Sequence, residues 1–100
     1  MQFMIYCLDK PAAAALRAAN RAAHLDFLRA CGGNIKACGP LLGSDNETMI
    51  GSMLIVKAAD KSGADALLAN DPYRKADLFA SAELHPWRWV VGAPVGLNAG

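Results

Sequence analysis

Short apolar runs separated by turn-forming residues predict four β-strands along the chain. The first run, Gln2–Leu8, is almost continuously apolar and rich in β-forming residues. Further runs at Ile35–Leu42, Met49–Lys57 and Ser81–Val91 predict the second, third and fourth strands. Pro86 lies inside the last run and cannot donate a hydrogen bond to a sheet, which indicates an edge strand or a bulge there.

Two segments between these strands predict helices. Ala12–Cys31 is rich in alanine, follows a proline and ends before two glycines. A second helix should run to about Asn70, with Asp60 or Ser62 as its N-cap. A further helical turn is expected at Arg74–Leu78.

The order β-α-β-β-α-β predicts an α+β, ferredoxin-like fold. In this fold a four-stranded antiparallel sheet carries both helices on one face. A chain of 100 residues fits one domain, which residues 1–91 would form. Residues 92–100 contain three glycines and one proline and would form a flexible C-terminal tail.

The strands are apolar on both faces, although helices on one side can cover only one of them. In the first strand Phe3 and Ile5 alternate with Met4 and Tyr6, so that both faces carry large side chains. Strands of this kind are usually covered on both faces, and an exposed apolar face promotes association. We therefore expect a homodimer through the sheet face. The alternative is a monomer whose tail folds over the open face.

The composition supports the same expectation. Hydrophobic residues make up 54% of the chain, but 20 of its 100 residues are alanine. Alanine raises helix propensity and buries little area. Because a small chain also buries a small fraction of its surface, a second subunit would add to its stability.

Charge and patterning exclude several classes of function. Ten Lys and Arg against nine Asp and Glu give a formal net charge of +1, which argues against a nucleic-acid or anionic-membrane surface. RNA-recognition domains share this element order, but the third strand lacks their basic and aromatic pattern. No apolar run could span a bilayer and no secretory signal is apparent, so we expect a cytoplasmic protein. The three cysteines form no CxxC pair and are expected to be reduced thiols, not a disulfide framework or zinc site.

His24 is the residue best suited to proton transfer. On a helical wheel it falls within the inward-facing stripe with Phe27 and Leu28, away from Asp26 and Arg29. An imidazole titrates near neutral pH and can act as a general acid or base. The structural alternative is a buried histidine that is hydrogen-bonded to a carbonyl group.

Asp71 is the candidate partner of His24. An aspartate before a proline is commonly a turn former. In the functional interpretation its carboxylate holds and polarises His24, but sequence spacing does not decide whether the two side chains meet. Arg17 and Arg21 flank the His24 side of the helix and could bind an anionic substrate, although a solvated surface also accounts for them.

Other candidates come from the strands and turns. Gly39-Pro40 and Gly51-Ser52 interrupt strands, which indicates bulges or close backbone approach, with a pocket as one outcome. Tyr73 and two tryptophans, Trp87 and Trp89, could stack on an aromatic ligand or simply pack. His85 and Glu83 lack a third ligand, so no metal site is expected.

Together, these residues resemble the YciI-like (YCII-related) family. The resemblance runs from Phe3 to about Val91. It is carried by Tyr6 with Asp9-Lys10, Arg21–Leu25, Gly39-Pro40-Leu41, Gly51-Ser52, Asp71-Pro72-Tyr73 and Pro86-Trp87.

The resemblance implies a ferredoxin-like fold that assembles as a dimeric α/β barrel, as in muconolactone isomerases. It implies an active site built from His24 and Asp71. The enzyme hypothesis is then a small lyase or isomerase, in which His24 abstracts a proton from a small ring-shaped substrate and Asp71 stabilises the imidazolium. This chemistry requires no metal or organic cofactor. Where the family has an assigned activity, it is lyase-like elimination of halide from a chlorinated, hydroxylated ring. The residues expected to bind substrate are Arg21, Tyr6, Gly39, Pro40, Ser52 and Tyr73.

Two features depart from the family pattern. Gly32-Gly33-Asn34 replaces a charged helix end, and the loop after Gly43 is short. Both should alter the rim of the pocket, so the resemblance implies a small-molecule substrate without naming it. A non-catalytic dimer that holds a small metabolite in the same cleft is the alternative function.

Overall fold

The computed structural model describes residues 1–93 and confirms the ferredoxin-like fold. One antiparallel sheet has the strand order β2-β3-β1-β4. Its strands are β1 (Gln2–Asp9), β2 (Ile35–Leu42), β3 (Met49–Lys57) and β4 (Phe79–Trp87). The helices are α1 (Ala14–Cys31), the short 3₁₀ turn η1 (Gly32–Asn34), α2 (Lys61–Ala69) and α3 (Pro72–Lys75).

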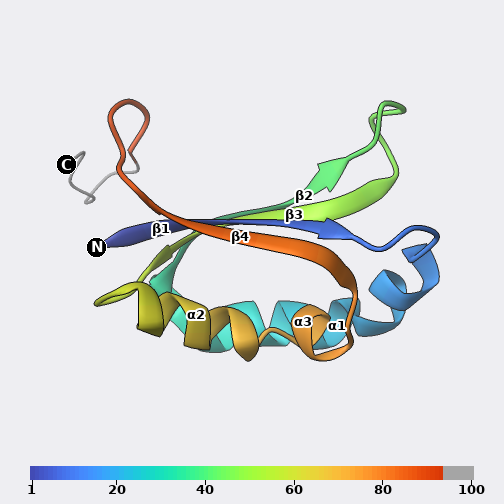
Figure 1. Ribbon diagram of the computed structural model, residues 1–100, viewed down its shortest axis with the longest axis horizontal. Coiled ribbons are helices and arrows are strands. Elements are labelled where there is room, and N and C mark those ends of the chain that lie inside the picture. The colour runs from blue at the N-terminus through green and yellow to red at the C-terminus, as the bar shows by residue number, and fades with distance from the viewer. Residues whose placement is uncertain (94–100) are drawn as a thin grey trace.

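All three α-helices lie against the same face of the sheet (Figure 1). Residues 94–100, most of the predicted C-terminal tail, lie outside the described residues. No helix within residues 1–93 is long and apolar enough to cross a membrane.

The predicted boundaries of β2 and β3 agree with the structure, whereas those of α1, α3 and β4 differ. Helix α1 begins two residues later than predicted because Ala12 has a φ of 55°, which lies outside the right-handed helical region. Strand β4 occupies 79–87 instead of 81–91 because its register on β1 runs from Asp9 opposite Phe79 to Gln2 opposite Trp87.

Side-chain caps fix the starts of α2 and α3. The Asp60 carboxylate accepts a hydrogen bond from the Gly63 N–H at 2.9 Å, which identifies Asp60 as the N-cap of α2. Asp71 caps α3 in the same way, and Pro72 occupies its first turn. The last helical turn therefore spans 72–75 and not the predicted 74–78.

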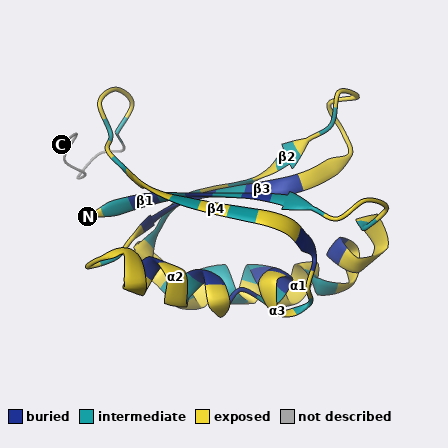
Figure 2. Ribbon diagram, viewed as in Figure 1, coloured by how far each residue is buried: buried dark blue, intermediate teal, exposed yellow. Residues whose placement is uncertain are grey.

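The core lies between the sheet and the helices. Phe3, Ile5 and Cys7 of β1 are buried on the helix-facing side, together with Leu54 and Val56 of β3. Figure 2 shows buried segments on the inner sides of the helices and in the sheet above them. These side chains pack with Leu68, Tyr73, Leu78 and Phe79 from the second half of the chain.

The other side of the sheet carries apolar residues that no helix in residues 1–93 covers. We call it the open sheet face. Strand alternation and register assign it Met4, Tyr6, Leu8, Met53, Ile55 and Trp87. All but Ile55, which is 4% exposed, are partly accessible in the single chain.

Candidate active site

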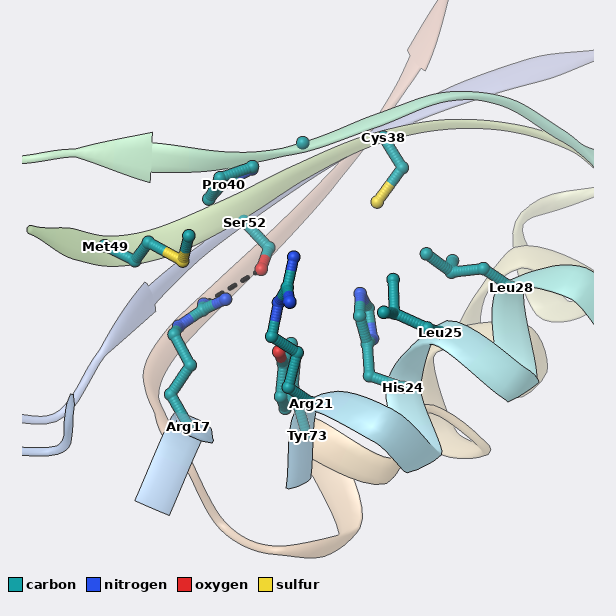
Figure 3. Close-up of a pocket in the computed structure, with 11 residues that line it drawn as sticks. Arg17, Arg21, His24, Leu25, Leu28, Cys38, Pro40, Met49, Ser52 and Tyr73 are labelled. Atoms are coloured by element: carbon teal, nitrogen blue, oxygen red, sulfur yellow. Dashed lines mark hydrogen bonds between the residues drawn. The ribbon is translucent and has the colours of Figure 1, made fainter. Parts of the chain in front are cut away.

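A cavity of about 120 Å³ lies between α1 and the helix-facing side of β2 and β3 (Figure 3). Its walls combine aliphatic side chains with two arginines, a histidine, a serine and a tyrosine. They are Arg17, Arg21, His24, Leu25, Leu28, Cys38, Gly39, Pro40, Met49, Ser52 and Tyr73.

His24 and Asp71 meet beside this cavity although 47 residues separate them in sequence. His24 Nδ1 lies 2.9 Å from Asp71 Oδ1, and the two residues are 6% and 1% exposed. Because a carboxylate accepts hydrogen bonds, Nδ1 is the donor, and in the neutral ring Nε2 carries the lone pair. No residue in the described part of the chain hydrogen-bonds Nε2, so this nitrogen is available to a ligand.

Asp71 is oriented by the backbone that it caps. Its Oδ1 also accepts the Tyr73 N–H at 2.9 Å, so one oxygen holds both the helix start and the histidine. Its Oδ2 is buried with no hydrogen-bond partner among residues 1–93. The turn-forming and histidine-holding interpretations of Asp71 therefore apply together.

Tyr73 fixes the plane of the imidazole. The two rings stack with centroids 4.0 Å apart and an angle of 17° between their planes. Tyr73 is buried and packs edge-on against Phe79 at 6.3 Å. Burial raises the pKa of the Tyr73 hydroxyl, while the nearby charge of Arg17 acts in the opposite direction.

Arg17 is buried, so its interpretation as solvated surface is wrong. It is 5% exposed, and its Nε and Nη2 donate to the two Asp9 oxygens at 2.7 and 2.9 Å. Burial by itself lowers the pKa of Arg17, but the hydrogen bond and charge of Asp9 outweigh it, and the pKa is raised. The i, i+4, i+7 spacing of Arg17, Arg21 and His24 is the sequence signal that places all three on one helix face.

Arg21 is the arginine that remains available to a ligand. It is exposed, and its guanidinium extends over the cavity beside His24 and Ser52 (Figure 3). None of the ion pairs between described residues includes it. The site therefore presents one neutralised and one unpaired arginine.

The strands supply the opposite wall. Gly39, Pro40 and Ser52 line the cavity as the sequence led us to expect. The sulfur of Cys38 points from β2 toward α1 (Figure 3). The pKa of this thiol is raised to about 11, chiefly by loss of hydration and secondly by the Asp71 charge, with Arg17 opposing. The thiol is therefore protonated at neutral pH.

Tyr6 lies away from the cavity, contrary to its expected part in substrate binding. It pairs with Met53 and Glu83 on the open sheet face, because alternation along β1 turns it away from Cys7, which faces the helices. The two tryptophans pack edge-to-face on each other, with centroids 4.8 Å apart and 76° between the rings, and neither lines the cavity.

No metal-binding cluster occurs within residues 1–93. No group of three His, Cys, Asp or Glu side chains there could hold a metal ion. His85 and Glu83 are 3.7 Å apart and exposed, on the face opposite the cavity.

A sequence comparison with protein families matches the YCII-related domain over residues 1–88. This chain belongs to the YCII-related domain family. Among solved structures, this YCII-related protein is similar to 5-chloro-2-hydroxyhydroquinone dehydrochlorinase from Burkholderia phenoliruptrix, determined in complex with 2,5-dihydroxybenzoquinone. The two are 35% identical, with a TM-score of 0.81, over 90% of this chain and 96% of that chain.

Two more distant structures share the fold alone. A protein from Agrobacterium tumefaciens is 14% identical, with a TM-score of 0.56, over 94% of this chain and 98% of its own. An antibiotic biosynthesis monooxygenase described as putative, from Bacteroides thetaiotaomicron, is 13% identical, with a TM-score of 0.53, over 98% and 93%. No curated protein sequence matches this YCII-related protein.

Proposed function

We propose that this protein is a lyase that eliminates halide from a halogenated, polyhydroxylated ring, with His24 as general base and Asp71 as its partner. The observation that carries the proposal is a buried, oriented histidine beside a cavity, whose Nε2 has no hydrogen-bond partner among residues 1–93. The dehydrochlorinase that is 35% identical provides the reaction class.

The dimensions and lining of the cavity support a single-ring substrate. An apolar cavity of roughly 150 Å³ holds benzene in another protein. The cavity here measures about 120 Å³. Its aliphatic lining, Leu25, Leu28, Pro40 and Met49, can contact the faces of a ring. Its polar groups can contact ring oxygens.

Loss of HCl from a chlorinated trihydroxybenzene requires proton transfers that one base can carry out. In the first step, His24 Nε2 takes the proton of the hydroxyl next to the C–Cl carbon. That C–O becomes a carbonyl, and the proton is returned to the chlorine-bearing carbon. In the second step, the hydroxyl para to this carbonyl loses its proton and forms the second C=O. The adjacent ring double bond shifts toward the chlorine-bearing carbon, the C–Cl bond breaks, and chloride leaves with its electron pair to give a hydroxyquinone. Asp71 stabilises the imidazolium that forms each time.

Arg21 suits the anionic stages of this sequence. Deprotonation of a ring hydroxyl creates a phenolate, and the second step releases chloride. An unpaired guanidinium over the cavity attracts either anion, and it does so most strongly when a bound ring displaces water.

The experiment measures chloride release from 5-chloro-2-hydroxyhydroquinone, together with the absorbance of the quinone product. We expect His24→Gln to lower kcat about 10²–10⁴-fold, the usual contribution of general acid–base catalysis. His85→Gln is the matched control, because this histidine is exposed on the opposite side of the sheet. A wild-type protein that binds 2,5-dihydroxybenzoquinone but releases no chloride would instead support the non-catalytic metabolite-binding function.

We also propose that two copies pair through the open sheet face, in the cytoplasm. The apolar side chains of this face would otherwise remain in contact with water, and the described helices cover only the other face. Light scattering should give about twice the 10.5 kDa mass of the chain. Met53→Glu, which places a charge on this face, should shift the mass toward the monomer. A wild-type monomer at micromolar concentration would contradict the pairing.

A further inference from the structure

Ser52 has a buried hydroxyl whose proton no group within residues 1–93 accepts. It is 2% exposed, lines the cavity, and its Oγ accepts a hydrogen bond from Arg17 Nη2 at 2.9 Å. A serine hydroxyl has one donor and two acceptor positions. Arg17 occupies an acceptor position, and no residue in the described part of the chain receives the Ser52 proton. The O–H is therefore available to donate to a ligand.

Three further contacts hold Arg17 beside Ser52. Two of its nitrogens engage Asp9 in a fork, and both side chains are 6% exposed. The guanidinium carbon also lies 4.6 Å from the centroid of the Tyr73 ring. A charged donor strengthens hydrogen bonds further along a chain by polarising the group that accepts from it. The Ser52 O–H is thus a stronger donor than an isolated hydroxyl.

Close packing of two strands fixes the backbone at Ser52. A Cβ added to the preceding Gly51 would lie 2.2 Å from the carbonyl oxygen of Cys7. Only glycine allows β3 to approach β1 so closely at this point. The same register places Ser52 opposite Cys7 on the helix-facing side of the sheet.

We propose that Ser52 donates a hydrogen bond to a second ring oxygen of the substrate, the one para to the oxygen that His24 deprotonates first, which becomes a carbonyl in the second step. Arg17 and Asp9 are positioning residues for the Ser52 hydroxyl. The inference rests on the proposed function, because it assigns the second oxygen within that reaction. The site then contains an acceptor, His24 Nε2, and a polarised donor, Ser52. It selects rings with both a hydroxyl and an acceptor oxygen over rings with a single hydroxyl.

Two probe ligands test this selection without turnover. 2,5-Dihydroxybenzoquinone presents both kinds of oxygen and is followed by its visible absorbance, whereas 4-chlorophenol presents one. Ser52→Ala should weaken binding of the quinone about 10- to 100-fold, the loss expected when one hydrogen bond to a charged or strongly polarised partner is removed. The same variant should leave binding of 4-chlorophenol unchanged. Ser52→Thr, which restores the hydroxyl, should recover most of the affinity for the quinone.

Arg17 is tested through its coupling to Ser52. Arg17→Lys keeps the charge beside Asp9 and loses the second donor branch, so it should also weaken quinone binding. In the Arg17→Lys/Ser52→Ala double variant the loss should be no larger than in Ser52→Ala alone, because Arg17 acts through Ser52. Independent, additive losses would overturn its assignment as a positioning residue.

The outcomes separate this inference from the proposed lyase activity. Equal affinity of wild type and Ser52→Ala for the quinone overturns the donor role, and so do equal losses for both ligands or no quinone binding by wild type. His24-dependent chloride release would still stand in the first two cases. If wild type binds the quinone through Ser52 but releases no chloride, the lyase activity fails and the donor role stands.

Discussion

Replacing Asp71 by asparagine would separate the charge of this residue from its geometry. Asparagine is nearly isosteric, is an equally good N-cap, and can still accept from the Tyr73 N–H and from His24 Nδ1. What the change removes is the negative charge beside a ring that would become an imidazolium in the proposed reaction. The substitution therefore measures how much of the proposed activity depends on that charge.

The magnitude follows from the 2.9 Å separation of Nδ1 and Oδ1 and from the burial of both groups. A hydrogen bond to a charged group contributes about 1.5–3 kcal/mol, against about 1 kcal/mol for a neutral one. Two unit charges about 4 Å apart attract each other by about 4 kcal/mol at an effective dielectric constant of about 20. The hydrogen bonds differ by up to about 2 kcal/mol and the charge attraction is about 4 kcal/mol, so the loss in transition-state stabilisation should lie between about 2 and 4 kcal/mol. This lowers kcat roughly 30- to 1000-fold.

Stability should respond differently from activity. Asp71 Oδ2 is buried without a partner among residues 1–93, so the native protein already includes an unfavourable desolvation term at this position. Removing the charge relieves part of that term, and we expect the free energy of unfolding to change by less than about 1 kcal/mol. Asp71→Ala, which also removes the cap, should destabilise the protein by about 1–2 kcal/mol.

The assay combines chloride release with urea denaturation for each variant. Asp26→Asn is the matched control, because this aspartate lies on α1, is exposed and pairs only with Arg29 among the described residues. A folded Asp71→Asn protein with kcat within about threefold of wild type would refute the assigned role of the charge.

Three further predictions concern the strands, the cavity thiol and a helix cap. Gly51→Ala should destabilise the protein by at least about 1–3 kcal/mol in urea denaturation, because its Cβ would meet the Cys7 carbonyl. Gly39→Ala is the control, since no atom lies within 4 Å of the added carbon, and equal stability of the two variants would contradict the prediction. Cys38, with a pKa of about 11, should react with iodoacetamide slowly at pH 8, where about one thiol in a thousand is ionised. The rate, measured by mass spectrometry of peptides, should rise about tenfold per pH unit up to the pKa. Labelling at pH 8 at the rate of a free thiol would refute the raised pKa. Asp60→Ala should lower the free energy of unfolding by about 0.5–2 kcal/mol and Asp60→Ser by much less, because only the first removes the N-cap of α2. If the cap contributed nothing, the two variants would have the same free energy of unfolding.

Local patterns determined most of the fold. The sequence predicted the boundaries of β2 and β3, and it narrowed the N-cap of α2 to Asp60 or Ser62, because apolar runs, turn residues and capping side chains act over a few neighbours. Helical periodicity likewise placed His24 on the inner side of α1. The same periodicity grouped Arg17 and Arg21 with it, although surface exposure seemed the simpler account of two arginines.

Tertiary structure decided how these residues work together. Local sequence patterns do not predict the contact between His24 and Asp71, because 47 residues separate them. The fold brings α1 and the start of α3 together, so that His24 Nδ1 and Asp71 Oδ1 lie 2.9 Å apart. Burial of Arg17 likewise depends on Asp9, which lies at the end of β1 and neutralises the guanidinium charge.

For Tyr6, the sequence predicted the alternation of faces but not which face carries the cavity. Alternation in the sequence already set it against Ile5 and Cys7, but only the packed structure showed that the cavity lies on the side of Cys7. The sequence by itself therefore determined the elements and the inward position of the histidine. Which side of the sheet carries the site, and which distant carboxylates support it, depended on packing, because those contacts join segments that no local pattern relates.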